Sequence, residues 1–123
     1  MKYVLLVFVG GGFGSVARYL ISKWLNNIEN DLPYGTLTVN VLGSLLMGLV
    51  IGYFMEGSDI SEEQTLLLAT GFCGGFTTFS AFAYEHHLFL KNGDYLNFAI
   101  YTLGSLILGV AAIFLGLYLS RLL

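Results

Sequence analysis

The sequence predicts an all-α membrane protein of four transmembrane helices, with the third helix broken near the middle of the bilayer. Of the 123 residues, 56% are hydrophobic and only 11% are charged, and mean hydropathy is +0.77. A soluble domain usually carries about 25% charged residues. The apolar residues also gather into four runs that are each long enough to cross a bilayer. We therefore expect one domain, residues 1–123, with spans at about 3–24, 34–55, 64–90 and 95–120.

Composition also excludes several classes of function. A net charge of −3 is too small to indicate a nucleic-acid partner. Cys73 is the single cysteine, so the chain forms no intrachain disulfide, and its apolar setting suggests an inert core residue. No nucleophile–base pair or metal-ligand set appears in the sequence, so we expect that the protein is not an enzyme.

The first span begins directly after Lys2. A basic residue before an apolar stretch is also typical of a signal peptide, but the glycine-rich continuation and the missing A-x-A site disfavour that interpretation. The segment from Gly10 to Gly14 lacks the third glycine of a dinucleotide-binding fingerprint, and no strand pattern leads into it. We interpret Gly10 and Gly14 as a G-x-x-x-G packing face. Arg18 either snorkels to the headgroups or raises the concentration of anions near an entrance.

The second span carries one polar face. Thr36, Asn40 and Gly43 are spaced so that they share one side of a helix. A neighbouring face of small residues is suited to helix packing, namely Ser44, Gly48 and Gly52. Asn40 is a full amide deep in an apolar segment. Taken alone it is best interpreted as a cross-helix hydrogen-bonding residue, although its NH₂ group could also donate to a permeating anion.

The third span contains the predicted break. Ser61 and Gln64 have the spacing of a capping box at its start. An unbroken helix over 64–90 would be longer than the hydrocarbon core of about 30 Å. Gly74 and Gly75, followed by β-branched Thr77 and Thr78, are poor helix formers in mid-run. The two glycines could instead serve only close packing. A break would free carbonyls for a small cation and amides for an anion.

Polar and aromatic residues follow the predicted break. Phe79 and Phe82 lie on one helix face, and Glu85 lies on an overlapping face. Aromatic pairs at this spacing usually pack, but the electropositive ring edges could also coordinate an anion. Glu85 is either a vestibule residue with a proton-sensitive role or a polar residue at headgroup level. We interpret His86 and His87 as interfacial residues, because adjacent histidines on a helix are poorly spaced for one metal ion.

The fourth span follows a tight turn at Lys91–Asp94 and is uncharged up to Arg121. Tyr101 and Ser105 share one helix face. That face continues through small residues: Gly109, Ala112 and Gly116. The pattern indicates a helix face that is polar in its first turns and then consists of small residues suited to packing.

Four spans place both termini on one side of the membrane, but charge barely selects that side. Lys2 and Arg121 lie on the terminal side, and Lys23 and Lys91 lie on the other. Because the positive-inside rule hardly favours one orientation over the other, such a chain could insert in both orientations. Two oppositely oriented copies would then pair about a two-fold axis in the membrane plane, and a chain this small has little room for a complete pathway by itself.

Three blocks of the sequence resemble the fluoride channel family, also called the Fluc or CrcB family. They are GGFGSVARY (11–19), YGTLTVNVLG (34–43) and GFCGGFTTFSAF (71–82). Order, spacing and length agree over nearly the whole chain. The resemblance implies an antiparallel homodimer with two fluoride pores, passive and selective fluoride export, and a structural sodium ion on the two-fold axis. It implies a multi-pass protein of a prokaryotic cell membrane, with fluoride, the lipid bilayer and an inverted second copy as its partners.

The resemblance also implies roles for individual residues. The carbonyls of Gly74 and Thr77 would hold the sodium ion, Arg18 would lie at a vestibule, and Glu85 would lie near the pore mouth. The side chains implied to line the anion pathway are Asn40, Phe79, Phe82, Ser80, Thr36, Tyr101 and Ser105. Ala81 and Gly109 depart from the hydroxyl residues of many relatives, which shortens the expected polar track.

Two rival functions remain at this stage. A proton-coupled small multidrug exporter also uses four short spans in an antiparallel dimer, but it needs a membrane-embedded carboxylate. The first span has none, and Glu85 lies near the end of a span. A non-transporting accessory subunit of a membrane complex would not need the polar break, Asn40 or the hydroxyl series.

Overall fold

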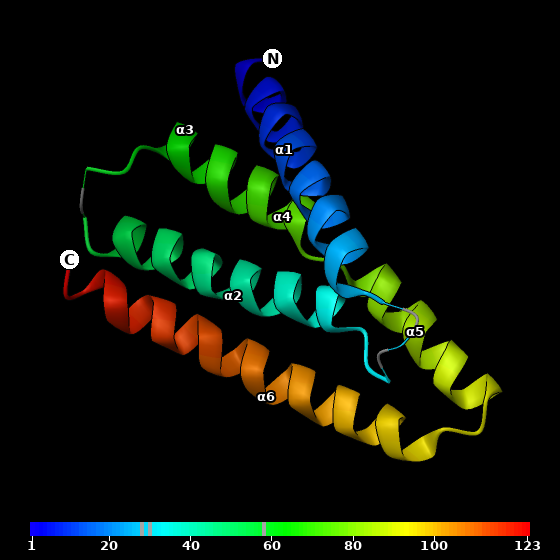
Figure 1. The fold of residues 1–123 in the computed structure, drawn as a ribbon. Coiled ribbons are helices and arrows are strands. Elements are labelled where there is room, and N and C mark those ends of the chain that lie inside the picture. Colours follow the sequence, from blue (N-terminus) through cyan, green and yellow to red (C-terminus); the bar gives the residue numbers. More distant parts are fainter. Residues whose placement is uncertain (28, 30, 58) are drawn as a thin grey trace.

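The structure, a computed structural model, describes residues 1–27, 29, 31–57 and 59–123, and all regular elements in these ranges are helices. Four of the described helices are long and apolar enough to cross a membrane, which confirms the predicted class. The third of them, Glu62–Lys91, comprises four elements. In chain order the elements are α1 (Lys2–Leu25), α2 (Tyr34–Met55), α3 (Glu62–Thr65), the π-helical segment η1 (Leu66–Cys73), α4 (Gly74–Phe76), α5 (Phe79–Lys91) and α6 (Tyr95–Ser120) (Figure 1).

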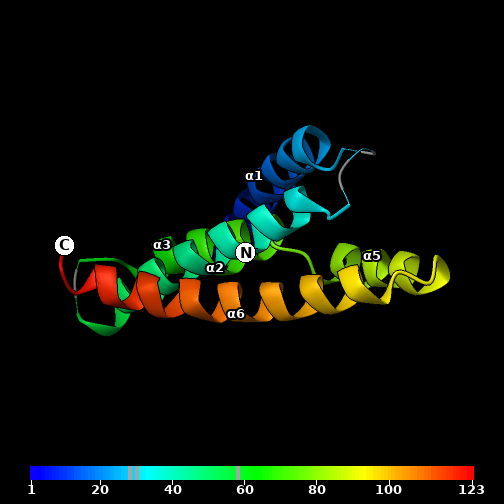
Figure 2. The ribbon, with the colours of Figure 1, turned by 60° about the horizontal axis from the view of Figure 1, so that its bottom comes forward.

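Two helix pairs organise the fold. α2 packs along α6, and α1 packs against η1 and α4. Figure 1 shows α2 and α6 side by side, with α1 crossing the third span near α4. In the turned view of Figure 2, α2 lies between α1 and α6. α5 leaves this arrangement and packs against the first half of α6.

Glycines bring α1 onto the third span. Gly10 and Gly14 are both buried. A Cβ atom on Gly10 would overlap the carbonyl oxygen of Leu67, and one on Gly14 would overlap the carbonyl oxygen of Phe72. The two backbones therefore touch directly, which confirms the predicted G-x-x-x-G face.

A second small-residue contact joins α2 to α6. A Cβ atom on Gly48 would overlap the carbonyl oxygen of Ile113, and one on Gly116 would overlap that of Leu45. A Cβ atom on Gly52 would overlap the hydroxyl of Ser120. The predicted packing faces of the second and fourth spans are therefore the faces by which these helices meet.

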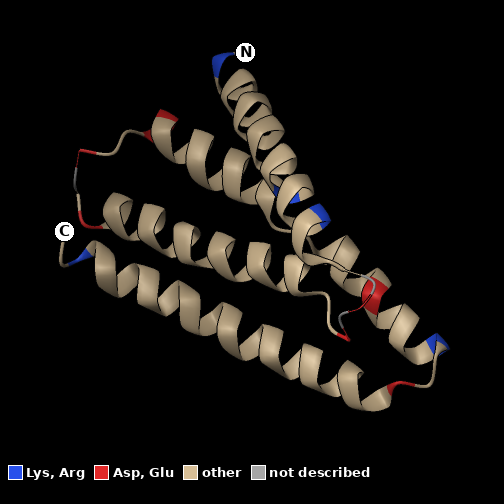
Figure 3. Cartoon of the chain, in the orientation of Figure 1, with Lys and Arg blue, Asp and Glu red and all other residues tan. Residues whose placement is uncertain are grey.

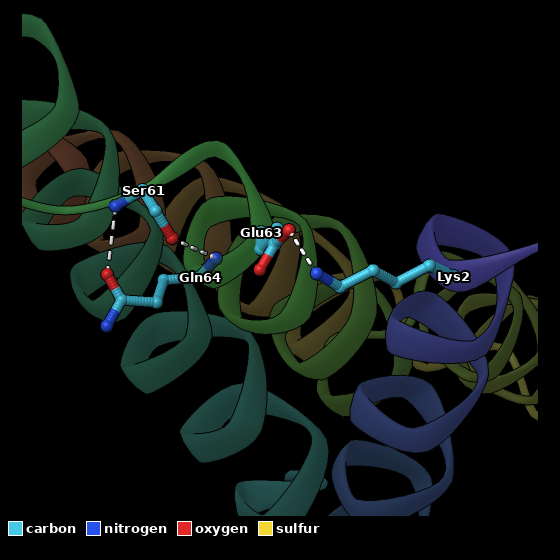
Figure 4. A network of polar contacts seen from close by, with 4 residues as sticks. All are labelled: Lys2, Ser61, Glu63 and Gln64. Carbon is cyan, nitrogen blue, oxygen red and sulfur yellow. Dashed lines mark hydrogen bonds and ion pairs between the residues drawn. The ribbon is translucent and has the colours of Figure 1, made fainter.

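Polar contacts fix the end of the molecule that carries both termini. Gln64 N–H donates to Ser61 Oγ over 3.1 Å, and Ser61 N–H donates to Gln64 Oε1 over 2.9 Å, which confirms the predicted capping box (Figure 4). Lys2 Nζ lies 2.5 Å from a carboxylate oxygen of Glu63. At the other end of the chain, Arg121 Nε lies 3.0 Å from Glu56 Oε1.

Charge is distributed as a membrane protein requires. Most Lys, Arg, Asp and Glu positions in Figure 3 lie at helix ends and connections. The spans instead expose large apolar side chains: Phe8 is 77% exposed, Phe13 69% and Phe114 67%. Such surfaces suit lipid or another apolar chain. The turn between α5 and α6 uses Gly93, whose positive φ of 70° is readily adopted only by glycine, at the predicted position.

Candidate functional site

The third span leaves the helical conformation at two threonines. α4 ends at Phe76 and α5 begins at Phe79. Thr77 has φ −81° and ψ 156°, and Thr78 has φ −148° and ψ 122°, which are extended conformations. Thr78 then caps α5, because its hydroxyl oxygen accepts the N–H of Ala81 over 3.2 Å.

This interruption releases several carbonyls from helical pairing, and those of Gly74 and Thr77 are two of them. In a regular helix each carbonyl accepts the N–H four residues later. The N–H that would reach Gly74 belongs to Thr78, and it donates instead to Asn40 Oδ1 over 2.7 Å. The N–H that would reach Thr77 belongs to Ala81, and it donates to the hydroxyl of Thr78. The same two carbonyls were predicted to hold a cation, and oxygen ligands of this kind suit hard metal ions.

Arg18 lies at the interruption, a position that neither sequence interpretation anticipated. Its Nε donates to the carbonyl oxygen of Gly75 over 3.0 Å, and Ser15 Oγ lies 3.5 Å from the same oxygen. The close crossing of α1 over α4 explains this contact, since a Cβ atom on Gly75 would overlap the backbone of Gly11. The half-buried guanidinium therefore pairs a carbonyl that the break has freed.

Asn40 pairs with the extended backbone from the opposite side. Its Oδ1 accepts from Thr78 N–H, and its Nδ2 donates to the carbonyl oxygen of Thr78 over 3.1 Å. The side-chain amide thus takes the place of a backbone partner, in line with the cross-helix interpretation. An NH₂ group carries two hydrogens. Because one is used at Thr78, the other is available to a ligand beside Asn40.

Asn40 lines an open cavity of about 380 Å³ between α2, α5 and α6. Among the predicted site residues, the cavity brings together Asn40, Phe79, Phe82, Ser105 and Thr77. No charged side chain of the described residues lines it. Ser105 Oγ is buried and has no hydrogen-bond partner among the described residues, so its hydroxyl is free to donate. The remaining lining residues are Gly43, Ser44, Met47, Thr78, Leu106, Gly109 and Ile113.

The two phenylalanines form part of this wall. Their ring centroids lie 5.9 Å apart and their planes are inclined by 36°. Phe79 is 79% exposed, whereas Phe82 is half-buried and lies 5.0 Å from the ring of Tyr101. One ring therefore lies on the open surface of the chain, and the other is fixed against α6.

Glu85 is the centre of a polar cluster just beyond Phe82. One carboxylate oxygen accepts the hydroxyl hydrogen of Thr36 over 2.5 Å, and the other accepts that of Tyr101 over 2.6 Å. Thr36 and Tyr101 are 1% and 2% exposed. Asn26 Nδ2 donates to Thr36 Oγ1 over 3.2 Å. Glu85 is therefore bound into the protein by two buried hydroxyls.

A second hollow, of about 250 Å³, adjoins this cluster. Glu85 contributes to its lining, together with residues of the connection between α1 and α2 and of the end of α5: Asn26, Asn27, Asp31, Leu32, Pro33, Leu88 and Phe89. Phe82 lines the first cavity and Glu85 the second, and Tyr101 contacts both residues. The predicted residues thus form a row of polar and aromatic groups that connects two open hollows.

Two predicted residues lie elsewhere. Ser80 is exposed and is not among the residues that line the first cavity, although its Oγ lies 3.2 Å from Oγ1 of Thr78, which does line it. His86 is buried within the protein, which its interpretation as an interfacial residue did not anticipate, whereas His87 is exposed. His86 turns towards α6 because α5 packs there, a contact that helical periodicity on α5 alone does not specify.

The sequence interpretation also missed Asn26 and Ser15. Asn26 Oδ1 accepts Gly35 N–H over 2.7 Å and Thr36 N–H over 3.3 Å, so it pairs free amides at the start of α2. The short connection before Pro33 was a usable signal, because it must bring Asn26 near that helix start. No local signal marks Ser15, whose partner lies in another span.

Comparison with known proteins identifies the family. Residues 5–117 match the family described as CrcB-like protein, Camphor Resistance (CrcB). The chain is 52% identical over 122 residues to a fluoride-specific ion channel FluC of Gloeothece citriformis, an alignment that covers 98% of each chain. It is 48% identical to that of Chlorobium chlorochromatii, with 97% of this chain and 92% of the relative covered. For the Pyrococcus furiosus relative, identity is 41%, and 98% of each chain is covered.

The names of these relatives describe channels and not enzymes, which confirms the prediction that the protein is not an enzyme. The matched residues include the second and third membrane-spanning helices in full and most of the first and fourth. The chain therefore belongs to the CrcB-like family, the family of the fluoride-specific ion channels to which it is similar.

Proposed function

We propose that the protein is a fluoride-selective channel of the cell membrane that lets fluoride leave the cytoplasm passively. The observation that carries the proposal is the uncharged cavity at the interruption, where Asn40, Ser105 and the ring of Phe82 meet. Fluoride is small and strongly hydrated, so a pore has to replace its water with donors. Amide, hydroxyl and aromatic-edge donors do so without the tight binding that a fixed cation would impose.

The proposed route for the anion passes along the row of groups between the two hollows. Phe79 and Phe82 present ring edges, and Thr36 and Tyr101 supply hydroxyls beyond them. The carboxylate of Glu85 holds both hydroxyls by their hydrogens. Fluoride would therefore compete with Glu85 for these donors, which makes the cluster a control point and not a permanent anion site.

We further propose that two copies assemble in opposite orientations and form two pores. The third span would then be discontinuous at mid-membrane depth in each copy, and the exposed faces would be covered by the partner or by lipid. Gly74 supports this assembly, because it is exposed and a Cβ atom on it would meet nothing within 4 Å. Phe79 supports it as well, because a ring that is 79% exposed beside a cavity needs a further surface to close a pore.

Orientation is testable with one introduced thiol. The native Cys73 is buried and stays unreactive towards a membrane-impermeant maleimide. With Asn92→Cys in the turn after α5, we expect about half of the molecules to be labelled from outside intact cells. Complete labelling, or none, would contradict dual topology.

A structural sodium ion is the proposed cofactor. The carbonyls of Gly74 and Thr77 from each copy would supply four oxygens, and the diverted amides of Thr78 and Ala81 support this assignment. When bound, the ion would offset the dipoles of carbonyls that have lost their helical partners. We expect the purified dimer to be more heat-stable in sodium than in N-methylglucamine; equal stability would count against the ion.

Fluoride efflux from proteoliposomes tests the function directly. Vesicles loaded with fluoride are diluted into fluoride-free buffer, and efflux is followed with a fluoride electrode while a potassium ionophore balances charge. We expect fluoride efflux with no matching chloride efflux. Movement of a cationic dye driven by a proton gradient, without fluoride efflux, would instead support the small multidrug exporter, and no transport would support an accessory subunit.

A further inference from the structure

His86 is a buried titratable residue that the proposed anion route does not use. Its side chain is held between α5 and α6 by both ring nitrogens. Nδ1 lies 2.7 Å from the carbonyl oxygen of Phe82, and Nε2 lies 2.6 Å from Thr102 Oγ1. The residue is only 9% exposed, although the next residue, His87, is exposed.

The imidazole forms the wall behind the pore phenylalanine. Its centroid lies 4.1 Å from that of Phe82 and 4.9 Å from that of Tyr101, which it stacks at 28°. The ring of Phe98 meets its edge at 4.8 Å. Phe82 lines the cavity and His86 does not, so the histidine acts on the cavity only through Phe82 and Tyr101.

We propose that His86 is a positioning residue for Phe82, and that the protonation of His86 makes fluoride conduction depend on pH. The proposal rests on the proposed function, since it concerns the same cavity.

The hydrogen-bond partners allow His86 to change its charge in place. A carbonyl oxygen only accepts, so Nδ1 carries a hydrogen in both charge states. In the neutral ring, Nε2 accepts the hydroxyl hydrogen of Thr102. In the charged ring, Nε2–H donates to Thr102 Oγ1. The hydroxyl hydrogen of Thr102 then donates to the carbonyl oxygen of Phe98, which lies 2.7 Å from Thr102 Oγ1. Protonation therefore reverses one hydrogen bond and leaves no buried polar group unpaired.

The positive charge of protonated His86 would lie close to the proposed anion route. Among the described residues, two titratable groups adjoin His86: Glu85 precedes it on α5, and Tyr101 stacks on it from α6. Glu85 is already bonded to Thr36 and Tyr101. A positive ring behind Phe82 adds attraction for fluoride at the ring edge, and a fixed cation slows release. We therefore expect protonation of His86 to lower both the half-saturating fluoride concentration and the maximal flux.

The test is saturable fluoride flux between about pH 5.5 and pH 8, the range in which histidine usually changes charge. Protein-free vesicles correct for HF leak at each pH. For the natural sequence we expect the half-saturating fluoride concentration and the maximal flux each to fall about threefold or more as the pH is lowered from about 8 to about 5.5. A change of this size is comparable to the effect of one hydrogen bond. His86→Gln keeps an amide that can bond Thr102 but cannot titrate, so its profile should be flat. His87→Gln is the matched control and should retain the pH dependence.

A second readout follows the ring itself. In protein labelled with ¹⁵N-histidine, the neutral form of His86 should be the Nδ1–H tautomer, and Thr102→Val should shift its Nε2 signal without affecting His87. A pH-dependent flux that His86→Gln leaves intact would overturn the inference while the channel function stands. An Nε2–H tautomer would also overturn it. Absence of fluoride flux from the natural sequence at every pH would overturn the channel function, and the inference with it.

Discussion

The side chain of Asn40 pairs with both backbone polar groups of Thr78, one on each side of its Cα atom. Oδ1 accepts the N–H over 2.7 Å, and Nδ2 donates to the carbonyl oxygen over 3.1 Å. An amide side chain thus provides on α2 the pairing that a neighbouring strand would provide in a sheet. Because lipid offers no such partner, this contact allows an extended segment to exist within a membrane span.

Asn40→Leu should therefore destabilise the interruption itself. The substitution leaves one N–H and one carbonyl of Thr78 without partners, at a cost of about 1–3 kcal/mol for each buried group. We expect a lower thermal midpoint of the purified protein and loss of fluoride flux. Asn40→Asp keeps the acceptor and should lose less stability than Asn40→Leu. Asn92→Leu, in an exposed turn, is the control, and equal stability of the two leucine variants would contradict the assignment.

Arg18 should act through its hydrogen bond more than through its charge. Arg18→Gln retains a donor for the carbonyl of Gly75, whereas Arg18→Ala leaves that carbonyl only the long 3.5 Å contact with Ser15 Oγ, at a cost of about 1–3 kcal/mol. We expect the glutamine variant to retain most of the thermal stability and flux, and the alanine variant to lose both. If Arg18 instead attracts anions, both variants should lose flux equally, and the loss should fade at high salt. Lys23→Gln serves as the control for a change of charge at the same end of α1.

Phe82→Ile should reduce fluoride flux without preventing assembly. Isoleucine fills much of the space but has no electropositive ring edge, a difference of about 0.5–1.5 kcal/mol, which is about two- to tenfold in rate. Flux is measured in liposomes that contain protein verified as a dimer by size exclusion. Phe114→Ile, on an exposed face of α6, should conduct normally. Unchanged flux through the Phe82 variant would remove that ring from the pathway.

The two hydroxyls bound to Glu85 should be energetically coupled. Thr36→Val and Tyr101→Phe each remove one donor from the same carboxylate. In a double-mutant cycle on thermal stability and flux, we expect a coupling energy of about 0.5–3 kcal/mol. Strictly additive effects would show that the cluster does not act as a unit. Thr36→Val combined with Phe114→Ile provides the uncoupled pair for comparison.

Close packing of α1 should make Gly10 intolerant of a side chain. Gly10→Ala would place a methyl group on the carbonyl oxygen of Leu67, and overpacking of this kind costs about 1–3 kcal/mol. Gly104→Ala is the matched control, because a Cβ atom there meets nothing within 4 Å. We expect a clear fall in thermal midpoint for the first variant and no fall for the second. A tolerated Gly10→Ala would contradict the direct backbone contact between α1 and η1.

The sequence by itself determined the class, the four spans, the cap at Ser61 and the glycine faces. These features rest on composition and on spacings within one helix, which a single segment displays in full. The π-helical bonding of η1 had no such signal, and it lies where the glycines of α1 approach most closely.

Only the tertiary structure decided which groups meet between helices. Arg18 reaches Gly75, Asn40 reaches Thr78, and His86 turns inwards to Phe82, because of where the helices cross. A helix pattern fixes the face on which a residue lies, but not the neighbour opposite that face. In an apolar medium every freed backbone group needs a partner, so the crossings that supply those partners are what allow this interruption to form.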